Sequence, residues 1–189
     1  DPELATSAAT LNIGVGFFQD PQEAQGIAHF LEHMIFMGSK KYKSPNEYME
    51  FITQNGGSTN AFTAAEQTTY LFSINNKKFA PALDRLSAAI MEPLFDGTMV
   101  EKEINAVNSE WLKNRQTDAF IQQRTLALTG NPSHPRAKLG VGNKDTLGSN
   151  EEQLLGSLRD FHEKFYSANL MKLVLVGNQS SKEMAKLAR

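Results

Sequence analysis

The distribution of apolar and polar residues predicts strands and helices that are interleaved along the chain. Loosely alternating or strand-favouring residues predict strands over residues 9–18 and 172–176. Two further short strands, at 58–64 and 68–74, are separated by only three residues and should form a hairpin. A hairpin implies that the strands of this sheet pair in antiparallel fashion.

Helices are predicted where apolar residues recur with a helical period or where capping residues mark an end. The expected ranges are 21–37, 44–55, 79–91, 96–128 with a break near 117–118, and 151–166, and the last residues, 182–189, are typical of an unfinished helix. A loop rich in glycine and proline is expected over 130–148. Together these elements predict an α+β fold, a two-layer sandwich of a mainly antiparallel sheet with helices packed on one face.

The first of these helices contains the most informative residues of the chain. Asp20 followed by Pro21 is a typical helix start, and Gly38 is a plausible stop. Five apolar side chains recur at helical spacing and indicate one buried face: Ala24, Ile27, Ala28, Leu31 and Ile35.

Within this helix, His29, Glu32 and His33 form the pattern H-x-x-E-H, which is known as the inverzincin pattern. Residues four apart lie on one face of a helix, so both imidazoles could bind one zinc ion. Glu32 is rotated by about 100° from His33 around the helix, which makes it a poor third ligand. It could still act as a general base on a water at the metal. Two buried histidines without a metal are the alternative.

A catalytic zinc usually has three protein ligands, and the chain has no cysteine to supply one. His134 and His162 could serve, but an isolated histidine is weak evidence of a metal site. Carboxylates on the predicted long helix are better candidates: Glu101, Glu103 and Glu110. Glu103 and Glu110 are two turns apart on one face, and the spacing does not decide between them.

Composition narrows the classes of function. With 189 residues, 40% of them hydrophobic, the chain can bury a core as a single domain. A net charge of −2 gives no indication of a nucleic-acid or membrane partner, and no apolar run is long enough to span a bilayer. A chain without disulfides is typical of a reducing compartment such as the cytoplasm, although a periplasmic or secreted location also fits.

Almost the whole chain resembles the pitrilysin/insulin-degrading-enzyme family of zinc metallopeptidases. Five stretches carry the resemblance, and they occur in the family's order: 26–34, with its continuation at 39–42, 57–63, 105–110, 130–135 and 166–171. The resemblance implies that Glu110, which closes the stretch Asn-Ala-Val-Asn-Ser-Glu, is the third zinc ligand. It also implies that Glu103 does not bind the metal itself but helps to orient the ligands.

The resemblance further implies how peptides would bind. Peptide substrates would add as a strand along Asn60, Ala61 and Phe62, and Phe120 would line the same cleft. Residues 1–189 would be a single N-terminal metallopeptidase domain, cut at both ends from a longer multidomain enzyme whose remaining domains are its partners.

The sequence therefore predicts a zinc endopeptidase in which His29, His33 and Glu110 hold Zn²⁺ and Glu32 is the general base. The fragment is not expected to complete the reaction without the missing domains. The alternative is a non-catalytic binding or assembly subunit of the same fold. Such a subunit has no chemical need for Glu32 and both histidines together.

Overall fold

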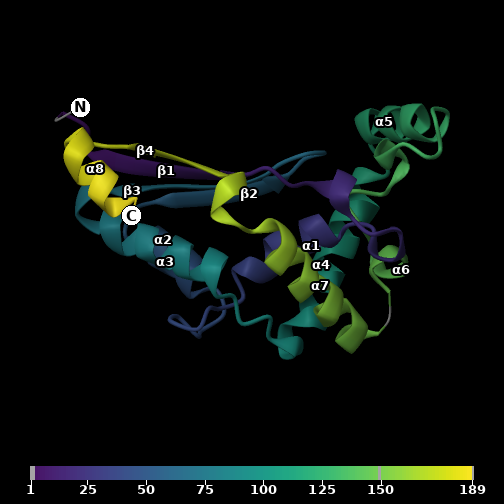
Figure 1. The fold of residues 1–189 in the computed structure, drawn as a ribbon, viewed down its shortest axis with the longest axis horizontal. Coiled ribbons are helices and arrows are strands. Elements are labelled where there is room, and N and C mark those ends of the chain that lie inside the picture. Colours follow the sequence, from purple (N-terminus) through teal and green to yellow (C-terminus); the bar gives the residue numbers. More distant parts are fainter. Residues whose placement is uncertain (1–2, 149, 189) are drawn as a thin grey trace.

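A single antiparallel sheet organises the computed structural model, which describes residues 3–148 and 150–188. Its four strands follow the order β2–β3–β1–β4. Their bounds are Thr6–Ile13 for β1, Ser58–Thr63 for β2, Thr68–Asn75 for β3 and Met171–Val176 for β4. The helices that pack on the sheet lie on one side of it (Figure 1).

The helical layer has two levels. Helices α1 (Ile27–Ile35), α2 (Glu47–Gln54) and α3 (Phe79–Met91) pack directly against strands. Helices α4 (Gly97–Asn114) and α7 (Glu151–Phe165) pack against α1. The remaining helices are α5 (Asp118–Leu128), α6 (Lys144–Leu147) and α8 (Ser181–Leu187), and five short 3₁₀ turns occupy Phe17–Gln19 (η1), Gln22–Ala24 (η2), Asn76–Lys78 (η3), Pro135–Ala137 (η4) and Ala168–Leu170 (η5).

Burial along β3 explains why the helices cover only one face. Tyr70, Phe72 and Ile74 alternate along the strand and are fully buried beneath the helices. Leu71 and Ser73 point to the opposite face and stay partly exposed. This alternation fits an antiparallel sheet with one packed face. The predicted α+β sandwich with helices on one face is therefore confirmed.

The predicted hairpin is confirmed, but the first strand is shifted. β2 and β3 pair from Ser58 opposite Ser73 to Thr63 opposite Thr68. The strand expected over residues 9–18 instead covers Thr6–Ile13. Beyond it, Phe17 and Phe18 donate backbone hydrogen bonds to the carbonyls of Ala64 and Ala65. These bonds draw the chain to the turn of the hairpin and out of the sheet.

The long helical stretch is divided where the sequence predicted a break. α4 ends at Asn114, and the Thr117 hydroxyl accepts a hydrogen bond from the Phe120 N–H at the start of α5. The loop predicted over 130–148 is only partly a loop, because it contains η4 and the short helix α6. Asn143 caps α6 through its side chain and fixes this part of the chain beside α4.

The start predicted for the metal-motif helix at Asp20 and Pro21 is wrong, because α1 begins at Ile27. Gly26 has a φ of 94°, a left-handed conformation that suits glycine and separates η2 from α1. Asp20 nevertheless caps the helix from a distance. Its carboxylate accepts hydrogen bonds from the N–H groups of Gly26 (2.6 Å) and Ala28 (3.1 Å). A buried acidic side chain thus satisfies amides that the helix leaves without partners.

We expect Asp20→Ala to lower the free energy of unfolding by about 1–3 kcal/mol, because two amide groups at a buried helix end lose their acceptor. Denaturant unfolding of the full chain measures this. Asp96→Ala is the matched control, because Asp96 caps α4 through the Thr98 N–H at a more exposed site. Its loss should be smaller. Equal losses in the two variants would contradict a special role of the Asp20 cap.

Candidate metal centre

Helix α1 carries two histidines side by side on one face. His29 and His33 are one turn apart, with ring centroids separated by 4.9 Å and ring planes nearly perpendicular, at 89°. Both side chains are mostly buried, with 15% and 18% of their surface exposed. The opposite side of α1 is anchored by apolar residues such as Phe30, Leu31 and Met34 that are fully buried. The position of the two imidazoles is therefore set by the core.

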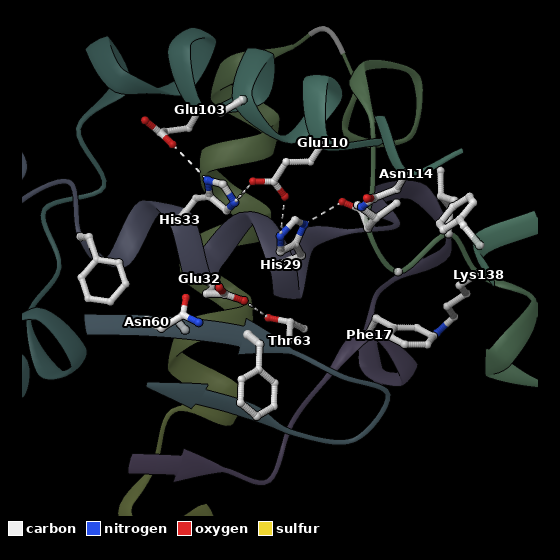
Figure 2. A pocket seen from close by; sticks show the side chains of 18 of the residues that line it. Phe17, His29, Glu32, His33, Asn60, Thr63, Glu103, Glu110, Asn114 and Lys138 are labelled. Carbon is white, nitrogen blue, oxygen red and sulfur yellow. Dashed lines mark hydrogen bonds and ion pairs between the residues drawn. The ribbon is translucent and has the colours of Figure 1, made fainter. Parts of the chain in front are cut away.

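Helix α4 brings a carboxylate to the same point (Figure 2). Glu110 lies with Oε2 at 3.4 Å from His29 Nε2 and with Oε1 at 3.6 Å from His33 Nε2. Ligand atoms of the three residues all lie within 4.8 Å of one another. Two atoms bound to one tetrahedral zinc at about 2.0–2.1 Å are about 3.3 Å apart, close to both distances. The three side chains are thus close enough together to hold a single ion.

The outer nitrogens of both imidazoles are held by acceptors. His29 Nδ1 lies 2.8 Å from the backbone carbonyl of Val141, and His33 Nδ1 lies 3.1 Å from Glu103 Oε2. A carbonyl can only accept, so His29 carries its proton on Nδ1. The same tautomer of His33 satisfies the buried carboxylate of Glu103. In the neutral form, both Nε2 lone pairs then face Glu110, the arrangement that ligating histidines require.

Glu32 lies on the side of α1 that faces the sheet. Its carboxylate is almost fully buried and accepts a hydrogen bond of 2.5 Å from the Thr63 hydroxyl at the end of β2 (Figure 2). Burial raises the pKa of Glu32, and the Thr63 hydrogen bond and the two nearby imidazoles oppose this increase only in part. A carboxylate with a raised pKa is suited to accept a proton and then to release it.

The pKa values of Glu110 and His29 are shifted in opposite directions. The hydrogen bond to His29 lowers the pKa of Glu110, against a smaller opposing effect of burial. For His29, burial alone would lower the pKa, but hydrogen bonds to Glu110 and the Val141 carbonyl, together with the charge of Glu32, raise it overall. Without a metal, the attraction between His29 and the negatively charged Glu110 requires the protonated imidazole, whose Nε2–H donates to the Glu110 carboxylate; a bound metal ion would take the place of that proton.

The centre opens into a cleft of about 770 Å³. The family resemblance predicted four residues in contact with the substrate. All four line this cleft: Asn60, Ala61 and Phe62 on β2, and Phe120 on α5. Phe62 is 43% exposed although it is a large aromatic side chain. The cleft is large enough for several residues of an extended peptide.

The strand β2 has a free edge along this cleft, because β3 is its only neighbour in the sheet among the described residues. The Ala64 N–H bonds to the Gln67 carbonyl at the hairpin end. Bonded and non-bonded pairs alternate along an antiparallel ladder, so the pair Ala61–Tyr70 is a non-bonded one. The N–H and C=O of Ala61 therefore point towards the free edge, where another strand can pair.

The other candidate ligands lie outside the group. His134 Nδ1 accepts a hydrogen bond from the Arg136 N–H, and its ring packs edge-on against Phe18. His162 Nε2 lies 2.7 Å from the Ile90 carbonyl. Glu101 is exposed on α4. Glu103 approaches His33 at Nδ1, the nitrogen that faces away from Glu110, so it supports that imidazole from behind.

Sequence reasoning missed two residues that contact the site. Thr63 could have been found, because it continues the edge strand that was predicted to hold the substrate. Val141 had no signal, because its contribution is a backbone carbonyl, which every residue has.

None of the described helices is long and apolar enough to cross a membrane.

Comparison with protein families gives two matches. Residues 1–133 match the model described as insulinase (peptidase family M16). Residues 154–189 match the model described as the peptidase M16 inactive domain. The histidines, Glu32 and Glu110 all lie within the first match, which covers more than half of the chain.

Curated proteins and solved structures match over nearly the whole chain. The A-factor-processing enzyme of Saccharomyces cerevisiae is 45% identical over 95% of the chain, and human insulin-degrading enzyme is 40% identical over 99%. Protease 3 of Escherichia coli is 43% identical over the whole chain. A crystal structure of pitrilysin superposes with a TM-score of 0.96 at 43% identity over the whole chain.

The chain spans only about a fifth of the length of these relatives: 18% of the yeast protein, 19% of the human protein and 20% of the bacterial protein and of the pitrilysin chain. The predicted family resemblance is confirmed by the family match, by the identities and by the fold. The chain belongs to the insulinase family, peptidase family M16.

Proposed function

We propose that the chain is the metal-binding domain of a zinc-dependent endopeptidase that hydrolyses peptides bound as an added β-strand. The observation that carries the proposal is the convergence of two imidazole Nε2 atoms and the Glu110 carboxylate beside the buried Glu32. A further support is the membership of the chain in a peptidase family.

The donor set fits zinc. Two neutral imidazoles and one carboxylate are a known ligand set of catalytic zinc sites, which keep a further position for water or substrate. His29, His33 and Glu110 would hold the ion, with Val141 and Glu103 fixing the imidazoles. Zinc bound there would polarise the scissile carbonyl and lower the pKa of a coordinated water to about 7.

Glu32 would carry the proton during hydrolysis. Its carboxylate would accept a proton from the attacking water and then deliver it to the nitrogen of the leaving amine. The Thr63 hydroxyl would hold this carboxylate in place through its hydrogen bond to Oε2. Burial, which raises the pKa of Glu32, favours the protonated form that the second step requires.

The free edge of β2 would position the peptide. A substrate strand beside β2 would exchange backbone hydrogen bonds with Ala61, and its peptide bonds would pass the Glu32 side of α1. Phe62 and Phe120 would contact substrate side chains in the cleft. Backbone pairing gives affinity with little sequence selectivity, so selectivity would come from these contacts.

The remaining domains of a longer protein would be the partners of this chain. Its relatives are about five times longer than the part that it matches. We therefore expect peptide hydrolysis from the full-length protein and treat residues 1–189 as one part of the active enzyme.

We expect about one zinc per chain in protein prepared without chelator. His33→Ala and Glu110→Gln should lose it, because each removes one of three ligands. Glu101→Gln is the matched control on an exposed position of α4 and should retain zinc. Elemental analysis measures the content. Metal-free wild-type protein would contradict the proposal and favour a non-catalytic subunit.

We expect Glu32→Gln to retain zinc and to lose peptidase activity by a factor of about 10²–10⁴, because the amide cannot accept the proton. Activity and zinc content are measured on the same preparation of the full-length protein. Substantial remaining activity in a zinc-loaded variant would show that another group transfers the proton.

Peptide backbone pairing can be tested with substrates in which each amide is methylated in turn. We expect kcat/KM to fall about tenfold or more when the methyl group replaces the N–H that bonds to the Ala61 carbonyl. Methylation of an adjacent amide, which would point away from β2, is the control and should have less effect. Equal effects at all amides would exclude pairing with the β2 edge.

A further inference from the structure

The two histidines of the centre are supported in different ways. Glu103, which holds His33, belongs to α4, the helix that also supplies Glu110. His29 depends on the Val141 carbonyl, which lies in the loop 138–142 between η4 and α6. The orientation of one metal-facing imidazole is therefore set by a loop 112 residues away in the sequence.

Two glycines bring this loop to the start of α1. Gly142 has a φ of 70°, and a Cβ added to it would lie 3.0 Å from the Cα of Gly26 and 3.3 Å from the Gln25 carbonyl oxygen. A Cβ added to Gly26 would lie 2.3 Å from the Cα of Gly142. Only two residues without side chains allow the backbones this close approach. The contact fixes the carbonyl of the preceding residue, Val141, above His29.

The loop is anchored by polar contacts on both sides of Val141. Lys138 Nζ donates to the carbonyls of Phe18 (2.7 Å) and Asp20 (2.5 Å). The Leu139 N–H donates to Gln25 Oε1, and the Thr146 hydroxyl donates to the Gln25 carbonyl, each at 2.8 Å. All of these acceptors belong to the segment that leads into α1. The loop and the start of the metal-motif helix therefore form one connected unit.

The same loop reaches the substrate side of the cleft. Arg124 Nη1 on α5 donates to the carbonyls of Ala137 (3.1 Å) and Lys138 (2.8 Å). Arg124, Lys138 and Val141 all line the cleft that contains the metal centre. A displacement of α5 would therefore be passed to the loop that holds His29.

We infer that the loop 138–142 is a positioning element that sets the zinc affinity of the centre, with Gly142 and Lys138 as its positioning residues. It acts by holding the Val141 carbonyl against His29 Nδ1, which keeps the Nε2 lone pair directed at the ion. The inference rests on the proposed zinc function and adds residues that contact neither the metal nor the reacting atoms.

The first test compares two glycine variants of the full chain by zinc competition with a chelator. We expect Gly142→Ala to raise the zinc dissociation constant about 10- to 100-fold, the usual effect of losing support behind a ligand. Gly56→Ala is the matched control, because Gly56 has a φ of 71° and no atom within 4 Å of an added Cβ. The Gly56→Ala variant imposes the same backbone strain and should leave the zinc affinity unchanged. Equal affinities in the two variants would overturn the inference.

A second test remains available if Gly142→Ala does not fold. Lys138→Met removes the two anchoring bonds and keeps most of the side chain's volume. Losing a positive charge beside the cleft should strengthen cation binding by electrostatics alone, whereas losing the anchor should weaken it about tenfold. Lys40→Met, at a lysine that is 69% exposed and paired with Glu92, is the control for the charge change. Unchanged or tighter zinc binding in Lys138→Met would overturn the inference.

A third readout does not require zinc. In the metal-free protein, ¹⁵N chemical shifts of the imidazoles report which nitrogen carries the proton. At a pH where the imidazoles are neutral, we expect the Nδ1–H form of His29 in the wild type and a mixture of tautomers in Lys138→Met, while His33 keeps the wild-type pattern. An unaltered His29 in that variant would contradict positioning by the loop. Failure of the proposed function is distinguishable, because then the wild-type protein itself would bind no zinc.

Discussion

The site depends on the packing of α4 across α1, which places the Glu110 carboxylate opposite the Nε2 atoms of His29 and His33. Both imidazoles can offer an Nε2 lone pair to one metal ion, together with this carboxylate, only if their protons are on Nδ1. Acceptors behind each ring ensure this: the Val141 carbonyl for His29 and Glu103 for His33. The apolar side of α1 is buried in the core, so the helix cannot turn the two histidines away from α4 without disturbing the packing.

The sheet contributes a strand that contacts the proposed base and has a free edge. β2 ends beside α1, where Thr63 binds the Glu32 carboxylate, and its free edge runs along the same cleft. One short strand thus holds the proposed base and offers the backbone groups to which a peptide could pair. The proposed chemistry and the proposed substrate alignment are therefore linked through residues that are close in sequence, from Asn60 to Thr63.

Local patterns in the sequence predicted much of this. Helical spacing predicted that His29 and His33 share a face, and a seven-residue separation predicted the same for Glu103 and Glu110. The hairpin followed from the short gap between two strand-like segments. Spacing alone left Glu103 and Glu110 equivalent as ligands. The structure separates them by geometry, since Glu103 reaches Nδ1 of His33 and Glu110 reaches Nε2 of both rings.

Contacts made by the backbone or across long sequence distances were not predictable. The role of Val141 comes from its carbonyl, and the role of Gly142 comes from a close approach to Gly26 that no local pattern encodes. The helix start was placed too early because Asp20 followed by Pro21 has the sequence of a local cap, whereas the Asp20 carboxylate bonds to amides six and eight residues ahead.

The central claim is that His29, His33 and Glu110 bind one zinc ion, with both imidazoles coordinating through Nε2. Anomalous diffraction at the zinc absorption edge, from crystals of the full-length protein, tests it most directly. The account predicts one strong peak about 2.0–2.2 Å from the two Nε2 atoms and a Glu110 oxygen, with His29 Nδ1 still bonded to the Val141 carbonyl. A peak at other side chains, or coordination through Nδ1, would contradict it.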